Sequence, residues 1–205
     1  ANAILSATVL VALIAAPLAR ADPDAPAPIV STTAGKVQGE VGDGVYAFKG
    51  IPYAADTSGA NRWLAPKIPE PWSDVRNATT FMDRCPQTEN DGGFTALIEN
   101  VTGVSAPSLS NPDAGISEDC LGINVYTPAL DENLPVMVWI HGGALTNGAG
   151  SLYPGEVLAK AGDVIVVTIN YRLGFLGYIA HPELSGTNFG LLDQVKALEW
   201  VSENI

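Results

Sequence analysis

Two uninterrupted apolar runs on either side of a short helix-forming segment constrain the fold of this chain more than any other feature. Residues 136–140 read VMVWI and residues 164–170 read VIVVTIN, lengths that suit strands rather than helices. Between them, residues 154–161 read PGEVLAKA and precede Gly162, a pattern typical of a short helix with a glycine stop. A strand, a helical crossover and a second strand predict a parallel pair, and the unbroken apolar runs predict strands covered on both faces.

Further elements are predicted around this unit. Short β-prone runs between glycine turns predict small antiparallel strands at residues 29–31, 36–38 and 45–48, and the run 121–127, which ends at Pro128, predicts another strand. The segment 61–75 is dense in proline and tryptophan, which predicts irregular structure. Near the end of the sequence, apolar residues at three- and four-residue spacing predict an amphipathic helix that turns this stripe toward the sheet. The stripe consists of Leu191, Leu192, Val195, Leu198, Trp200 and Val201.

These elements predict an α/β fold in which small antiparallel strands lead into a mostly parallel central sheet flanked by helices. A length of 205 residues suffices for one domain, and 47% hydrophobic against 16% charged residues is typical of a globular protein. The chain has 10 basic and 22 acidic residues, a formal net charge of -12. This charge argues against nucleic acid or an anionic membrane as the partner.

The first 21 residues have the pattern of a secretory signal peptide. An apolar run over residues 3–16 precedes Pro17 and the triplet Ala19-Arg20-Ala21, which predicts cleavage after Ala21 and a secreted or extracytoplasmic location. The alternative, a membrane anchor, is disfavoured by Pro17 and by the short apolar run, so no stable membrane insertion is expected after cleavage. Residues 22–28 then form an extended tail, and the folded domain covers residues 29–205. Because the sequence starts with Ala1, we expect that the true N-terminus lies further upstream.

The two cysteines, Cys85 and Cys120, favour one disulfide because their count is even and the chain carries an export signal. Such a bridge closes a loop of about 35 residues. The loop is rich in Gly, Asn, Ser, Pro and acidic residues, a composition that predicts a surface loop. Two free thiols are the alternative. No metal site is predicted, since no second Cys or His lies at ligand spacing near either cysteine.

The loop His141-Gly142-Gly143-Ala144 is the candidate functional site. It follows a predicted parallel strand, at the edge of the sheet where ligands of α/β folds bind. Glycines let the backbone turn sharply and bring its N–H groups close to a ligand, where they stabilise the oxyanion that forms when an ester carbonyl is attacked. The alternative is a plain tight turn after a strand. His141 is not assigned as a catalytic base, because no nucleophile motif lies nearby.

No catalytic triad is readable in the 205 residues. The nucleophile motif G-x-S-x-G is absent, and Ser117 and Ser151 lie near glycines without the required spacing. His181, followed by Pro182, is expected to be a surface loop residue.

Five motifs occur in the order seen in the type-B carboxylesterase, or cholinesterase-like, family of the α/β-hydrolase superfamily, and the chain resembles the N-terminal part of that family over nearly everything from Ile29 onward. The motifs are FKGIPYA at 48–54, EDCLGINVY at 118–126, HGGA at 141–144, NYRLG at 170–174 and NFGLLDQ at 188–194.

The resemblance implies roles for particular residues. The backbone N–H groups of Gly143 and Ala144 would form part of the oxyanion hole, with Gly142 shaping the loop, and Cys85 and Cys120 would form the family's first disulfide. The resemblance also implies buried ion pairs between Arg62 and Glu118 and between Arg172 and Asp193, since charges in a core need partners.

The resemblance implies a carboxylic-ester hydrolase that acts on a small-molecule ester through a serine nucleophile and an acyl-enzyme, without a cofactor or metal. The triad would lie beyond Ile205, so the 205 residues alone are expected to be inactive. The sequence HGGA resembles that of bacterial para-nitrobenzyl-esterase-like enzymes. No Trp lies between the cysteines, which disfavours a choline ester because cation–π binding needs that ring. The alternatives are a non-catalytic, neuroligin-like adhesion protein and an inactive truncated gene product.

Asn77 and Asn100 begin N-glycosylation patterns that are interpreted as incidental.

Overall fold

The computed structural model describes residues 20–88, 100–101, 103 and 114–205 and contains two sheets. A three-stranded sheet has the order β1-β2-β5, and a five-stranded sheet has the order β3-β4-β6-β8-β7. The strands are β1 (Ile29–Ser31), β2 (Lys36–Gln38), β3 (Glu40–Gly42), β4 (Val45–Pro52), β5 (Arg76–Asn77), β6 (Gly122–Thr127), β7 (Val136–Ile140) and β8 (Ile165–Ile169). The helices are η1 (Gly59–Asn61), η2 (Gly150–Leu152), α2 (Glu156–Gly162), α3 (Gly174–Tyr178) and α4 (Phe189–Asn204).

The predicted parallel pair is present, whereas the prediction of a mostly parallel sheet is wrong for the described residues. β7 and β8 pair in parallel from Val136 opposite Ile165 to Ile140 opposite Ile169, joined by the crossover helix α2. The other pairs of this sheet, β3 with β4, β4 with β6 and β6 with β8, are antiparallel. The reason is that the short connection 128–135 reverses the chain between β6 and β7, so β6 runs against β8.

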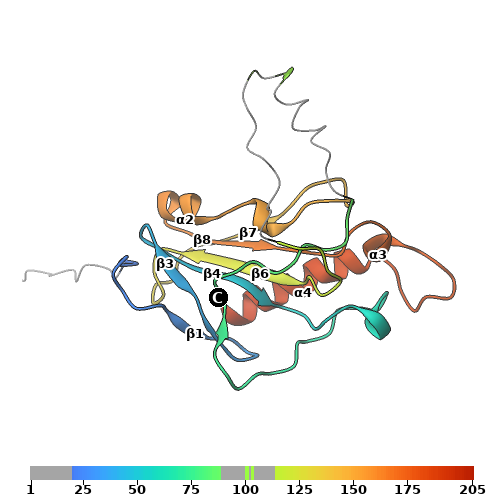
Figure 1. Ribbon diagram of the computed structural model, residues 1–205, viewed down its shortest axis with the longest axis horizontal. Coiled ribbons are helices and arrows are strands. Elements are labelled where there is room, and N and C mark those ends of the chain that lie inside the picture. The colour runs from blue at the N-terminus through green and yellow to red at the C-terminus, as the bar shows by residue number, and fades with distance from the viewer. Residues whose placement is uncertain (1–19, 89–99, 102, 104–113) are drawn as a thin grey trace, which may run out of the picture.

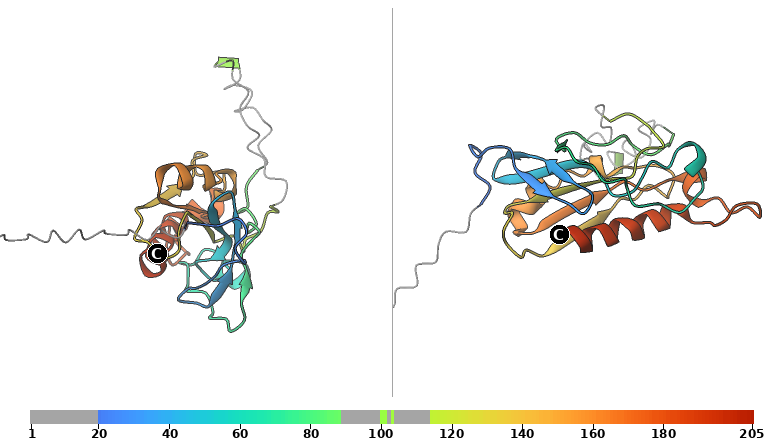
Figure 2. Two further views of the ribbon diagram at one scale, coloured as in Figure 1. Left: turned by 90° about the vertical axis from the view of Figure 1, so that its left-hand side faces the viewer. Right: turned by 90° about the horizontal axis from the view of Figure 1, so that it is seen from below.

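Helices cover both faces of the five-stranded sheet. α4 lies along one face, where Ala197 and Trp200 join a core with Ile123, Val167 and other residues, and α2 lies on the opposite face, where Ala159 meets a smaller core (Figures 1 and 2). The smaller core consists of Val45, Ala47, Tyr126, Ala159 and Val166. This helix–sheet–helix layering, with the parallel pair connected through α2, places the loops that follow β7 and β8 at one end of the sheet.

The predicted contact face of α4 is wrong for four of its six residues, whereas Trp200 and Val201 pack on the core as predicted. Leu191, Val195 and Leu198 are 51%, 47% and 45% exposed, and Leu192 is exposed too. The side of the helix that meets the sheet carries Phe189, Gly190, Asp193, Ala197 and Trp200. The helix is turned this way because Asp193 is held by Arg172 in the core, and a buried carboxylate requires its cation.

The prediction that β7 is covered on both faces is also wrong. Val136, Met137, Trp139 and Ile140 are between 39% and 44% exposed, while all six residues of β6 are buried. β7 lies at the edge of the sheet with β8 as its neighbour, and β6 lies between β4 and β8. Position in the sheet, rather than apolar composition, decides which strand is covered.

The remaining elements follow the predicted order, with additions. Strands β3 and β5 and helices η1, η2 and α3 were not predicted, and β4 extends past Phe48 through a bulge between Phe48 and Ile51. Regular structure begins at Ile29, preceded by a turn in which the N–H of Ala25 donates to the carbonyl of Asp22. The signal-peptide prediction for residues 1–19 and most of the loop between the cysteines lie outside the described residues. Among the described helices, none has the length and apolarity needed to cross a membrane.

Candidate active site

The loop that follows β7 has an unusual backbone. Gly143, Ala144 and Leu145 have φ angles of 116°, 53° and 62°, in the left-handed region that side chains rarely adopt. A Cβ on Gly143 would lie 2.0 Å from the carbonyl oxygen of Asn147, so only glycine fits there, whereas a Cβ on Gly142 would meet nothing. Non-glycine residues in this conformation store strain of about 1–3 kcal/mol each, and such strain concentrates at functional sites.

The backbone N–H groups of Gly143 and Ala144 are available to a ligand. Among the hydrogen bonds of the described residues, neither group acts as a donor, and both residues are exposed. The carbonyl of Gly143 is occupied, since it accepts from the N–H of Thr146 at 3.0 Å and of Asn147 at 3.2 Å. The loop therefore turns its acceptors inward and leaves adjacent donors free, which suits an anionic oxygen.

His141 lies inside the fold rather than in the open part of the loop. Its ring is 3% exposed and stacks on Tyr171 with centroids 4.4 Å apart, and its Nδ1 lies 2.8 Å from the carbonyl oxygen of Gly142. Because a carbonyl can only accept, Nδ1 is the ring nitrogen that donates in this contact. Burial lowers the pKa of His141, an effect that the hydrogen bond to Gly142 opposes. These contacts indicate that His141 supports the loop structurally and does not act as a general acid or base.

Two side-chain amides hold the end of the loop. Gln87 donates from Nε2 to the carbonyl of Gly148 at 2.9 Å and accepts from the N–H of Gly148 at 2.8 Å. Asn170, directly after β8, accepts from the N–H of Gly150 at 2.8 Å and donates to the carbonyl of Cys120 at 3.1 Å. The loop is thus fixed at both Gly148 and Gly150 by residues from other segments.

The structure brings together the cysteines and both pairs of charged residues named from the sequence. Cys85 and Cys120 form a disulfide, with both residues buried. Arg172 and Asp193 form a buried pair, with Nε 2.8 Å from Oδ2 and side chains 3% and 0% exposed.

Arg62 and Glu118 also pair, with Nε 2.6 Å from Oε2, but the expectation of burial is wrong because their side chains are 41% and 23% exposed. Arg62 lies in the irregular segment 61–75, where water reaches its guanidinium. His181, the other histidine, is exposed as predicted.

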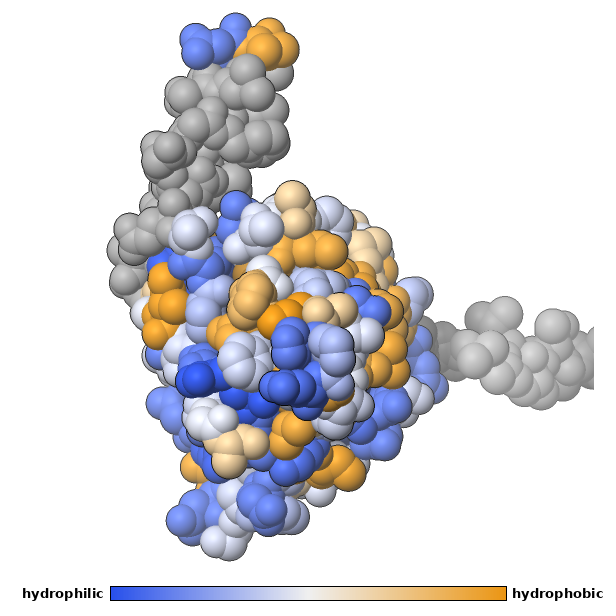
Figure 3. Space-filling view, turned by 90° about the vertical axis from the view of Figure 1, so that its right-hand side faces the viewer, coloured by the Kyte–Doolittle hydropathy of each residue, from blue (hydrophilic) through white to orange (hydrophobic). Residues whose placement is uncertain are grey.

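The loop lies at the end of the sheet where β7 and β8 finish, and that end presents apolar and polar surface side by side (Figure 3). Leu145 and Phe175, which follow these two strands, are 45% and 71% exposed. Exposed apolar side chains beside free backbone donors match an ester, which has an apolar body and one polar carbonyl.

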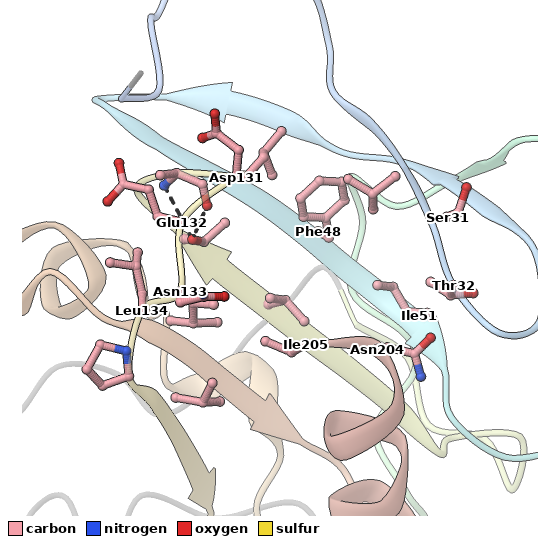
Figure 4. A pocket seen from close by; sticks show the side chains of 18 of the residues that line it. Ser31, Thr32, Phe48, Ile51, Asp131, Glu132, Asn133, Leu134, Asn204 and Ile205 are labelled. Carbon is pink, nitrogen blue, oxygen red and sulfur yellow. Dashed lines mark hydrogen bonds between the residues drawn. The ribbon is translucent and has the colours of Figure 1, made fainter. Parts of the chain in front are cut away.

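A cavity of about 790 Å³ lies at the opposite end of the sheet and contains none of the predicted site residues (Figure 4). It opens between the C-terminal turn of α4, the connection 128–135 and the first strand. The starts of β7 and β8, Val136 and Ile165, line it. Because ligands of α/β sheets bind at the carboxyl ends of the strands, this cavity is not the candidate active site.

The comparisons with known proteins agree on one family. The Carboxylesterase family model matches residues 26–205. The chain belongs to the carboxylesterase family. It is 47% identical over 183 residues to the para-nitrobenzyl esterase of Bacillus subtilis (strain 168), covering 86% of this chain and 35% of that protein. It is 42% identical to the human cocaine esterase, with 89% and 33% covered, and 39% identical to mouse neuroligin-3, with 91% and 26% covered.

Solved carboxylesterase structures share the fold. A para-nitrobenzyl esterase structure superposes with a TM-score of 0.75 at 45% identity, covering 87% of this chain and 35% of that one. A carboxylesterase of Geobacillus stearothermophilus gives a TM-score of 0.71 at 38% identity, covering 86% and 34%. These structures establish the α/β-hydrolase fold for this chain. The chain spans about a third of the length of these carboxylesterases.

Sequence reasoning did not find the residues that support the loop of this carboxylesterase-family chain. Gln87 follows the first cysteine by two residues and carries no motif, so only the folded structure shows that it reaches Gly148. Asn170 and Tyr171 belong to the NYRLG motif, but the sequence assigned them no role. A polar residue directly after an apolar strand was the available signal for Asn170, since such residues lie at the carboxyl edge of the sheet.

Proposed function

We propose that this chain supplies the oxyanion-hole loop of a serine carboxylic-ester hydrolase. The N–H groups of Gly143 and Ala144 would bind the oxygen of the ester carbonyl as it becomes negative, while a serine outside these 205 residues attacks the carbonyl carbon. The serine hydroxyl loses its proton to a histidine base, the acyl group is transferred to the serine, the alcohol leaves, and water releases the acid. No metal or cofactor takes part in these steps.

The single observation that carries the proposal is the pair of adjacent backbone donors, free of protein acceptors among the described residues, at the carboxyl end of β7. Fixed donors act before the reaction begins, and the loss of one typically lowers the rate about 10²- to 10³-fold. Family membership supports the same chemistry, because relatives at 47% and 42% identity are named as esterases.

The substrate of this proposal is a small-molecule carboxylic ester. The relatives' names include a para-nitrobenzyl esterase and a cocaine esterase, which favours esters with an aromatic part.

We further propose export of the protein with cleavage after Ala21, on the basis of the apolar segment over residues 3–16. Cleavage there would remove the ion pair that Arg20 makes with Asp163.

The second candidate is a non-catalytic adhesion protein, supported by 39% identity to neuroligin-3. The two functions differ at the nucleophile position. The test is to determine the coding sequence beyond codon 205, express the whole reading frame, and treat the product with a fluorophosphonate probe that labels activated serines. Labelling together with hydrolysis of p-nitrophenyl acetate supports the esterase, whereas an unlabelled, folded product with Gly or Ala in place of the serine of G-x-S-x-G supports adhesion.

A substitution in the loop tests the oxyanion assignment separately. In the active product, Gly143→Ala is expected to lower kcat at least 100-fold, because a Cβ there collides with the carbonyl of Asn147. Gly142→Ala is the matched comparison and is expected to lose much less activity, since a Cβ at Gly142 meets open space. Equal effects of the two substitutions would contradict the assignment.

A further inference from the structure

We propose that Gln87 is a positioning residue for the oxyanion loop and that it transmits the rigidity of the Cys85–Cys120 disulfide to Gly143 and Ala144. The inference rests on the proposed function, because it explains how those two N–H groups keep their direction. Gln87 touches neither the expected substrate nor the reacting atoms, and it acts only through Gly148.

The side chain of Gln87 makes two hydrogen bonds with the backbone of Gly148. The side-chain amide receives the N–H of Gly148 on Oε1 at 2.8 Å and donates to its carbonyl from Nε2 at 2.9 Å. A primary amide carries one acceptor and two donors, so it can bind both groups of one peptide residue and still donate once more. Its third bond, from Nε2 to the carbonyl of Cys85 at 3.0 Å, ties it to the disulfide.

Gly148 lies against the residues that begin the loop, His141 and Gly142. At Gly148, with φ 115°, a Cβ would lie 2.3 Å from Nδ1 of His141 and 2.7 Å from the carbonyl oxygen of Gly142. The end of the loop therefore packs directly on its beginning. A restraint on Gly148 consequently restrains Gly142 and the two donors that follow it.

The second cysteine of the disulfide is also linked to the end of the loop, through Asn170. Asn170 donates to the carbonyl of Cys120 at 3.1 Å and accepts from the N–H of Gly150 at 2.8 Å, so each half of the disulfide holds one glycine of the loop's end through one amide. Three hydrogen bonds from two amides, two to Gly148 and one to Gly150, therefore hold the segment 148–150. Catalytic donors need such support, because displacement by about 1 Å can cost about 100-fold in rate.

The test uses the enzyme encoded by the complete reading frame and the probe p-nitrophenyl acetate. Gln87→Met keeps the length of the side chain and removes all three hydrogen bonds, and it is expected to lower kcat about 10- to 100-fold with KM within about twofold. Gln87→Glu keeps an acceptor for the N–H of Gly148 but turns a carboxylate oxygen toward two carbonyls, and it is expected to lower kcat at least tenfold. Gln38→Met, the same change on strand β2 in the other sheet, is the control and leaves kcat and KM unchanged.

A second measurement does not depend on activity. Amide hydrogen exchange at Gly148 is expected to accelerate at least tenfold in Gln87→Met and to stay unchanged in Gln38→Met. A folded Gln87→Met enzyme with kcat within twofold of the wild type would overturn the inference, as would unchanged exchange at Gly148. A wild-type enzyme without esterase activity would instead overturn the proposed function, while the exchange experiment would still test the contact of Gln87 with the loop.

Discussion

The hydroxyl of Tyr171 donates a hydrogen bond to the backbone carbonyl of His141 at 2.7 Å, and the rings of the two residues stack. Tyr171 follows β8 and His141 follows β7, so the pair joins the carboxyl ends of the two parallel strands. Burial raises the pKa of Tyr171 to about 12, which keeps the hydroxyl protonated as a donor at physiological pH.

Tyr171→Phe is expected to destabilise the 205-residue chain by about 1–2 kcal/mol, because the buried carbonyl of His141 loses its donor. Urea unfolding measures the loss. Tyr153→Phe is the control, since no described residue bonds to the hydroxyl of Tyr153, and it should stay within about 0.5 kcal/mol of the wild type. Equal losses would show that the hydrogen bond to His141 contributes nothing.

Stability should depend on pH through His141. Its pKa is lower in the folded state than in the unfolded chain, so the unfolded chain binds more protons as the pH falls. The stabilisation is therefore complete above the unfolded pKa of about 6.5 and decreases as the pH falls below it. Replacing the ring in His141→Gln should flatten the dependence of the unfolding free energy on pH between 5 and 7. A slope that survives His141→Gln would refute this assignment.

The two ion pairs should differ in energy because they differ in burial. Asp193→Asn leaves the guanidinium of Arg172 buried without its counter-charge and is expected to cost about 3–5 kcal/mol. Glu118→Gln breaks the half-exposed pair with Arg62 and is expected to cost at most about 1 kcal/mol. Chemical denaturation of both variants makes the comparison, and similar costs would contradict the role given to burial.

The orientation of α4 can be tested with two substitutions one residue apart. Ala197 is fully buried against the sheet, so Ala197→Leu is expected to overpack the core and cost about 1–3 kcal/mol in the 205-residue chain. Leu198→Ala, at a residue 45% exposed, should cost well under 1 kcal/mol. The reverse order in thermal or urea unfolding would mean that the leucine stripe faces the sheet after all.

Local patterns were sufficient to predict which segments form elements and where the loop lies. The apolar runs at 136–140 and 164–170, with the glycine-stopped helix between them, predicted the parallel pair that the structure contains. His141-Gly142-Gly143-Ala144 was placed correctly at the end of β7 because a loop after a parallel strand can leave only from its carboxyl end. These features depend on neighbours in the sequence, so the sequence alone determines them.

Tertiary structure decided which surfaces are covered and what holds the loop. The stripe Leu191, Val195 and Leu198 is apolar at helical spacing, yet the helix turns Asp193 inward, because Arg172, 21 residues away, is buried and requires a carboxylate. Gln87 reaches Gly148 across 61 residues of sequence in the same way. Periodicity reports which residues are apolar, but burial and hydrogen bonding depend on partners that only the folded chain brings together.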